Sequence, residues 1–337
     1  YDTLVGLFGN GITPQGSEED ADSDQSLGDN DDADILTLGA RLDYDFDAFT
    51  FTSITGYKDH DFFYTEDYDG TPLNINNYRQ DQKGDYFQQE IRFVSNDDGP
   101  LSWYAGASFY KEEIDTLFVN SGAEDAFCNY YGNYYYPDEG ITDCQSYWDY
   151  IYPAAYYPGY TWYPSSDGNL SEPGRVIGEY TGWAAYLDLS YQFSDSFDVS
   201  LGVRYTNDEK DFTLNVPEPE SLLGGYWAYI FTTDGDIKTS KSWSDTTMRL
   251  VGRWHVSDSG MLYASYTEGY KSGGFGSFSL VDDVGDRVTG VYGATQADGF
   301  RGRAFEPESV DSYELGFKGA VFDGTTDLAI NAFFYDY

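Results

Sequence analysis

Short and long connections alternate along this chain of 337 residues. Amphipathic segments meet in pairs at very short turns, whereas the excursions between those pairs are long, polar and rich in aromatic residues. In an antiparallel sheet this alternation places every short turn at one end and every long loop at the other. A soluble sandwich or barrel has no reason for such an asymmetry. The short turns are Asp45-Phe46-Asp47, Asn96-Asp97-Asp98-Gly99, Ser194-Asp195-Ser196, Ser257-Asp258-Ser259-Gly260 and Asp323-Gly324, and the long excursions cover 61–80, 115–177, 214–240 and 272–306.

The amphipathic segments have the period of two residues that is typical of a strand with one apolar face. One face of the segment after Tyr180 carries Trp183, Leu187 and Leu189, and the other carries Tyr186 and Asp188. The same alternation predicts ten strands, and residues 1–8 are interpreted as the end of another. The ten are 34–45, 48–60, 82–96, 100–115, 178–193, 196–214, 241–256, 260–271, 308–321 and 325–337.

Composition favours a membrane location for this sheet. Aromatic residues make up 19% of the chain, with 34 Tyr and 23 Phe, as expected where side chains meet a lipid–water interface. No run of 18 apolar residues occurs, which excludes a helical span. A barrel turns only alternate residues towards lipid, so it needs no such run. The predicted fold is therefore all-β: an antiparallel transmembrane β-barrel with long extracellular loops.

The formal net charge of −41 excludes a nucleic-acid partner, because such a field repels phosphate. Some of the acidic residues lie in an early segment, where Asp20, Asp22 and Asp24 match the start of a calcium loop. The match then degrades, because Gln25 occupies the glycine position and Asp31 stands where a bidentate Glu is expected. A solvated acidic loop is the simpler interpretation, and calcium is the alternative; no other cofactor is predicted.

The longest excursion, 115–177, holds both cysteines of the chain, Cys128 and Cys144. Two thiols in one exposed loop predict a disulfide formed in an oxidising compartment. The same loop is dense in tyrosine and tryptophan, whose rigid amphipathic rings can bind flat or sugar-like ligands, or can instead pack the loop on itself or on a partner. The candidate ligand-binding residues are Tyr134, Tyr135, Tyr136, Trp148 and Trp162. Nucleophile-elbow, P-loop and zinc motifs are absent from the sequence, so no enzymatic activity is predicted.

Four segments resemble the barrel of TonB-dependent outer-membrane receptors of Gram-negative bacteria. The two stronger matches are Leu262-Tyr263-Ala264-Ser265-Tyr266-Thr267-Glu268-Gly269-Tyr270-Lys271-Ser272-Gly273-Gly274-Phe275 and Phe305-Glu306-Pro307-Glu308-Ser309-Val310-Asp311-Ser312-Tyr313-Glu314-Leu315-Gly316-Phe317-Lys318, and the weaker are Gln88-Gln89-Glu90-Ile91-Arg92-Phe93-Val94-Ser95 and Ile54-Thr55-Gly56-Tyr57. The resemblance implies a 22-stranded barrel closed by an N-terminal plug. It also implies an energy-supplying TonB complex that acts on the plug, a scarce solute as cargo, and contact with lipid and lipopolysaccharide.

The sequence departs from that pattern in what it lacks. Ten strands are about half of such a barrel, and no plug, partner-binding box or terminal strand is recognised within 1–337. We therefore expect 1–337 to be a partial barrel. The expected function is TonB-energised uptake of a solute such as a ferric siderophore or an oligosaccharide. A passive barrel (porin or adhesin) and a secreted carbohydrate-binding β protein are the alternatives.

Overall fold

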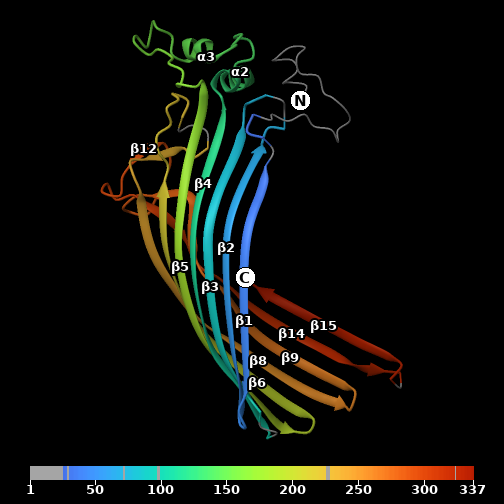
Figure 1. The fold of residues 1–337 in the computed structure, drawn as a ribbon. Helices are drawn as coiled ribbons and strands as arrows, with labels where there is room; N and C mark the ends of the chain where they lie inside the picture. The colour runs from blue at the N-terminus through green and yellow to red at the C-terminus, as the bar shows by residue number, and fades with distance from the viewer. Residues whose placement is uncertain (1–25, 29, 71–72, 97–98, 225–227, 323) are drawn as a thin grey trace.

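The computed structural model describes residues 26–28, 30–70, 73–96, 99–224, 228–322 and 324–337. Its main feature is one ten-stranded antiparallel sheet in which each strand pairs with the next along the chain, with β1 and β15 at the two edges (Figure 1). This confirms the ten strands predicted from sequence. They are β1 (Asp31–Asp45), β2 (Phe49–Asp67), β3 (Asn77–Ser95), β4 (Leu101–Ala123), β5 (Asn169–Ser194), β6 (Phe197–Asn215), β8 (Ile237–Ser257), β9 (Gly260–Lys271), β14 (Glu308–Val321) and β15 (Thr326–Asp336).

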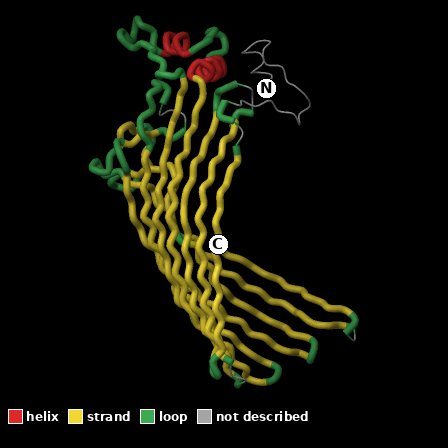
Figure 2. The backbone as a smooth tube through the Cα atoms, viewed as in Figure 1, coloured by secondary structure: helices red, strands yellow, loops and turns green. Residues whose placement is uncertain are grey.

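The short turns lie at one end of the sheet, and the long connections gather at the other (Figure 2). The connection between β4 and β5 contains two helices that the sequence did not predict, α2 (Glu124–Tyr135) and α3 (Cys144–Ile151). The connections after β6 and after β9 form two small sheets, β11-β10-β13 and β12-β7. Their strands are β7 (Phe231–Thr233), β10 (Gly274–Val281), β11 (Arg287–Val288), β12 (Val291–Ala294) and β13 (Arg301–Phe305). Neither helix of the described chain has the length and apolar character needed to span a bilayer.

Several strands extend further towards the loop end than the sequence predicted. β4 continues to Ala123 and β5 begins at Asn169, so their connection is 124–168 and not 115–177. The predicted boundaries fell short because the clean alternation of apolar and polar residues stops near Phe109 and Trp183. Beyond that level charged residues stand on the previously apolar face: Lys111 contacts Glu113, and Arg175 contacts Asp115.

The apolar face of the sheet is exposed over a band of defined height. Trp183, Leu187 and Leu189 are 48%, 40% and 37% exposed, and on β6 the apolar row runs from Phe197 to Tyr205 before Glu209 replaces it. Nine residues match the roughly 9–11 that a tilted strand needs to cross a bilayer. No second layer of the described chain covers this band, as a soluble sandwich would require.

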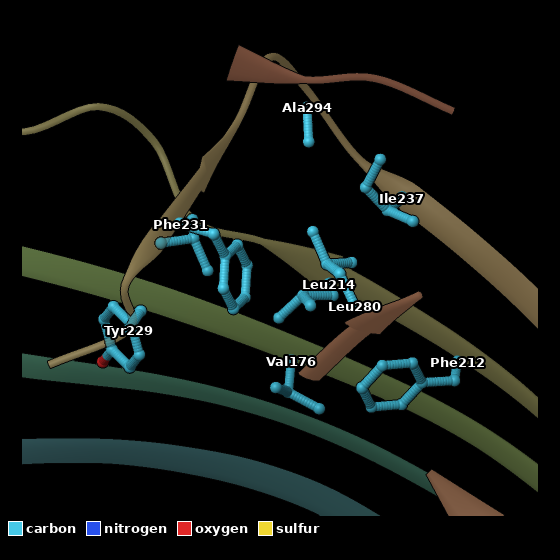
Figure 3. Close-up of a cluster of buried hydrophobic side chains, with 9 residues drawn as sticks. Val176, Phe212, Leu214, Tyr229, Phe231, Ile237, Leu280 and Ala294 are labelled. Carbon is cyan, nitrogen blue, oxygen red and sulfur yellow. The ribbon is translucent and has the colours of Figure 1, made fainter. Parts of the chain in front are cut away.

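A second layer does cover the opposite, polar face, but only at the loop end. There the upper parts of β5, β6 and β8 contribute Val176, Phe212, Leu214 and Ile237 to a buried cluster. Side chains from the connections pack onto them, including Phe231, Leu280 and Ala294 (Figure 3). Each is at most 8% exposed. The connections after β6 and β9 are therefore folded back over the polar face and fixed there by apolar burial.

Candidate functional site

Residues 124–168, here called the cap, form a cross-linked unit above β4 and β5. The predicted disulfide is confirmed: Cys128 of α2 is bonded to Cys144 of α3, with their Cα atoms 4.9 Å apart. Both cysteines are fully buried, in a small core that also contains Trp162, Leu170 and Leu223. Because a short helix is marginal alone, the disulfide and this core are what hold α2 and α3 together.

Acidic side chains stabilise the cap from within. Asp143 is the N-cap of α3 and accepts a hydrogen bond of 2.7 Å from the Ser146 backbone N–H. This hydrogen bond is the main reason why the pKa of Asp143 lies below its usual value. The carboxylate of Glu124 is buried, and both of its oxygens accept from the Ser165 N–H at 3.1 Å. Asp125 accepts from the Cys144 N–H at 3.0 Å.

The five aromatic residues singled out from sequence have different environments. Tyr134 and Tyr135 are 62% and 63% exposed and lie at the end of α2. Tyr136 is half-buried against Tyr147 and Tyr150. Trp148 and Trp162 pack on each other with ring centroids 5.4 Å apart, and Trp162 is only 7% exposed. The structure therefore gives the two tryptophans a packing role and leaves the two tyrosines accessible; whether they bind a ligand stays a prediction.

Further exposed rings lie in 153–164, among the loop aromatics that the sequence indicated but outside the five candidate residues. Tyr156, Tyr160 and Tyr163 are 81%, 61% and 64% exposed. Tyr152 stacks on Tyr160 with ring centroids 5.3 Å apart, and Trp148 contacts Tyr152, so these rings connect to the cap core. The sequence signal for this part is the run Tyr152-Pro153 to Tyr163-Pro164, because proline interrupts a helix and suits turns, and the structure has turns there.

On the polar face, side chains pair across an intervening strand, and each pair passes over a glycine. Tyr186 of β5 reaches over β4 to donate to Glu90 of β3, and Arg92 donates to the Tyr186 oxygen at 3.4 Å. A Cβ on Gly106, directly beneath, would lie 2.5 Å from Tyr186 Cζ. In the same way Tyr110 donates to Asp208 at 2.6 Å over Gly182.

The third pair of this kind joins Asp188 of β5 to Arg249 of β8 over Gly202 of β6. Arg249 Nη2 lies 2.7 Å from Asp188 Oδ2, and a Cβ on Gly202 would lie 2.5 Å from the same oxygen. A hollow of about 540 Å³ opens on this part of the sheet, lined by these groups and by Arg204, whose guanidinium stacks on Tyr186. Charged and hydroxyl groups thus form a connected polar wall.

The described part of the chain offers no clear metal site. Among the residues that the structure describes, no three His, Cys, Asp or Glu side chains are grouped so as to hold a metal ion. The predicted calcium ligands Asp20, Asp22 and Asp24 lie outside the described residues.

Comparison with known proteins decides which family this architecture belongs to. The family model described as TonB dependent receptor-like, beta-barrel matches residues 1–337. The chain belongs to this family. Its members are transport receptors of the Gram-negative outer membrane and not enzymes, so the apolar face of this TonB-dependent receptor chain is its lipid-facing surface and the polar wall faces the lumen.

Solved structures agree on the fold. The ferric yersiniabactin uptake receptor FyuA from Yersinia pestis aligns with 90% of this chain at 16% identity and a TM-score of 0.56. The siderophore receptor PiuA from Acinetobacter baumannii aligns with 89% at 15% identity and a TM-score of 0.53. The closed form of the ferric-catecholate import receptor Fiu from E. coli K12 aligns with 90% at 16% identity and a TM-score of 0.51.

This chain spans 35%, 40% and 41% of the lengths of FyuA, PiuA and Fiu, respectively. No curated protein sequence matches the chain. The solved structures therefore define its architecture and leave its cargo open.

Proposed function

We propose that this chain forms part of an outer-membrane receptor that imports a scarce solute with energy supplied through TonB. The observation that carries the proposal is the difference between the two faces of the sheet. One face has a lipid-facing belt, the other has the connected polar wall, and loops are folded over the polar face at one end only. This arrangement suits a barrel whose outer mouth is shaped for capture, and the family match supports it.

In this proposal the cap and the folded-back connections meet the solute first, and the polar wall lines its route. The plug that occludes such receptors would stand against the polar wall, and the TonB complex would act on it. FyuA is a ferric yersiniabactin uptake receptor, PiuA a siderophore receptor and Fiu a ferric-catecholate import receptor, which supports a small, scarce solute as cargo.

The test is an uptake assay with cells that express the full-length receptor. Accumulation of a radiolabelled solute should stop when TonB is deleted and return when it is supplied on a plasmid. Residual diffusion is measured in cells that carry no receptor. Accumulation that depends on the receptor yet is indifferent to TonB would assign the protein to passive barrels instead.

A further inference from the structure

The cap carries an unusual set of charges: its 45 residues contain seven carboxylates and no lysine, arginine or histidine. The carboxylates are Glu124, Asp125, Asp138, Glu139, Asp143, Asp149 and Asp167. A ligand that bears carboxylates, catecholates or phosphates is recognised by arginine or lysine donors. The cap has none to offer, and the chain as a whole adds a field from a net charge of −41 that repels anions.

Most of those carboxylates already serve the cap itself. Glu124, Asp125 and Asp143 accept backbone N–H groups, as described above, Asp149 accepts from the Gln145 amide at 2.9 Å, and Asp167 accepts from the Asn169 N–H at 3.0 Å. These carboxylates therefore stabilise the fold of the cap, which weakens the case for a cationic ligand.

The side chains that the cap exposes to solvent are mainly tyrosines. Tyr134, Tyr135, Tyr156, Tyr160 and Tyr163 are each more than 60% exposed, on a base held rigid by the disulfide and by Trp148 and Trp162. Tyrosine rings offer a flat apolar face together with a hydroxyl that both donates and accepts, and they lose little conformational entropy on binding. Those properties match the C–H faces and hydroxyl groups of sugars.

We propose that the tyrosines of the cap bind an uncharged oligosaccharide and that this is the solute which the receptor captures. The inference rests on the proposed function, because it names the cargo of that same uptake route. Tyr134 and Tyr135 on α2, whose rings stand at 88° to each other, and Tyr156 and Tyr160 beyond α3 are two separate pairs of exposed rings. A ligand of several sugar units, which can contact more than one ring, is therefore preferred to a monosaccharide.

The experiment uses the full-length receptor in detergent, immobilised for binding measurements. The probes are malto-, xylo- and cello-oligosaccharides, an oligogalacturonate as a charged sugar, and a tris-catecholate iron chelate. We expect at least one uncharged oligosaccharide to bind better than the oligogalacturonate and the chelate. Removing two rings, as Tyr134→Ala with Tyr135→Ala or Tyr156→Ala with Tyr160→Ala, should weaken its binding about tenfold, which corresponds to about 1.4 kcal/mol.

Two controls separate ring stacking from misfolding. The matching Tyr→Phe pairs keep the rings and should lose far less affinity than the Ala pairs. Phe193→Ala removes an aromatic ring that is 64% exposed near a short turn, at the opposite end of the sheet, and should leave binding unchanged. An intact Cys128–Cys144 disulfide, checked by mass spectrometry, shows that each variant cap is folded.

The inference is overturned when none of the three uncharged oligosaccharide series binds, when only the iron chelate binds, or when binding persists after both ring pairs are removed. Its failure is distinguishable from failure of the proposed function. TonB-dependent accumulation of the chelate without sugar binding would reject the cargo and keep the transport mechanism. Sugar binding with TonB-independent accumulation would keep the cargo and reject the transport mechanism.

Discussion

We expect even alanine at Gly202 to destabilise the protein, because the Asp188 side chain crosses directly above this glycine. The added Cβ would lie 2.5 Å from Asp188 Oδ2, about 1 Å closer than an ordinary contact between carbon and oxygen. The carboxylate must therefore move away from Arg249, whose Nη2 and Nε lie 2.7 and 3.3 Å from that same oxygen. Asp188 has a side chain only 7% exposed, so water replaces the lost hydrogen bonds poorly.

The size of the effect follows from two opposing terms. A hydrogen bond to a charged group contributes roughly 1.5–3 kcal/mol, and glycine within a strand costs roughly 0.5–1 kcal/mol relative to alanine. We expect Gly202→Ala to lower the free energy of unfolding by about 1–2 kcal/mol. Gly252→Ala on β8 is the matched control, since a Cβ there meets nothing within 4 Å, and it should be neutral or slightly stabilising.

The assay is denaturant unfolding of the full-length receptor in lipid vesicles, followed by tryptophan fluorescence, for both single variants and for a double-mutant cycle with Asp188→Ala. Once the carboxylate is gone, the methyl group introduced by Gly202→Ala has nothing to displace, so the cost of that substitution should disappear. An equal cost in the Asp188→Ala background would show that the clash with Asp188 is not the cause, and the reasoning about crossing side chains would have to be abandoned.

Three further outcomes test other parts of the structure. Leu201→Arg, at the middle of the lipid-facing row of β6, should destabilise the inserted barrel by about 2–4 kcal/mol. Glu209→Arg, on the same face above the belt, should cost little. Equal costs in vesicle unfolding would show that the lipid boundary does not lie between these two residues. Replacing Cys128 and Cys144 together by Ala should destabilise the cap by about 3 kcal/mol and speed its cleavage by thermolysin, with the sheet unaffected. Asp143→Ala should weaken α3 by about 1 kcal/mol near neutral pH. The pKa of Asp143 is lowered in the folded cap, so its stabilisation is present above the unfolded pKa of about 3.9 and is lost as pH falls through the lower folded pKa. Hydrogen exchange of the α3 amides should thus differ between Asp143→Ala and the unmodified protein at pH 6, and the difference should shrink as the pH falls below about 3.9.

The sheet was predictable because both of its signals are local. Turn residues such as Ser194-Asp195-Ser196 and the alternation from Trp183 to Phe193 are set by backbone geometry and by lipid on one side, and neither needs knowledge of distant contacts. The upper ends of β4 (116–123) and β5 (169–177) were missed because each face mixes apolar and polar residues there: Val176 is buried on one face and Arg175 pairs with Asp115 on the other. The period-two signal therefore fades. Pro173 lies within β5, at a position where proline is unusual because it has no N–H to donate to the ladder.

The cap was less predictable because tertiary contacts decide it. Tyr135 and Trp162 look equally suited to ligands in the sequence, yet one is exposed and the other is buried beside the disulfide. The start of α3 did carry a readable signal in Asp143 and Ser146, which cap each other. The glycines at 106, 182 and 202 also fell at polar-face positions, but which side chains cross them depends on strand register.

The height of β4 and β5 above the lipid belt has a consequence for where recognition takes place. From Tyr110 to Ala123 the strand adds roughly 14 residues, or about 45 Å of length at 3.3 Å per residue, and about 35 Å of elevation at a tilt of roughly 40°. The tyrosines therefore stand well away from the membrane surface. In the proposed uptake route, the cap would meet its solute at that height, before the solute reaches the opening of the barrel.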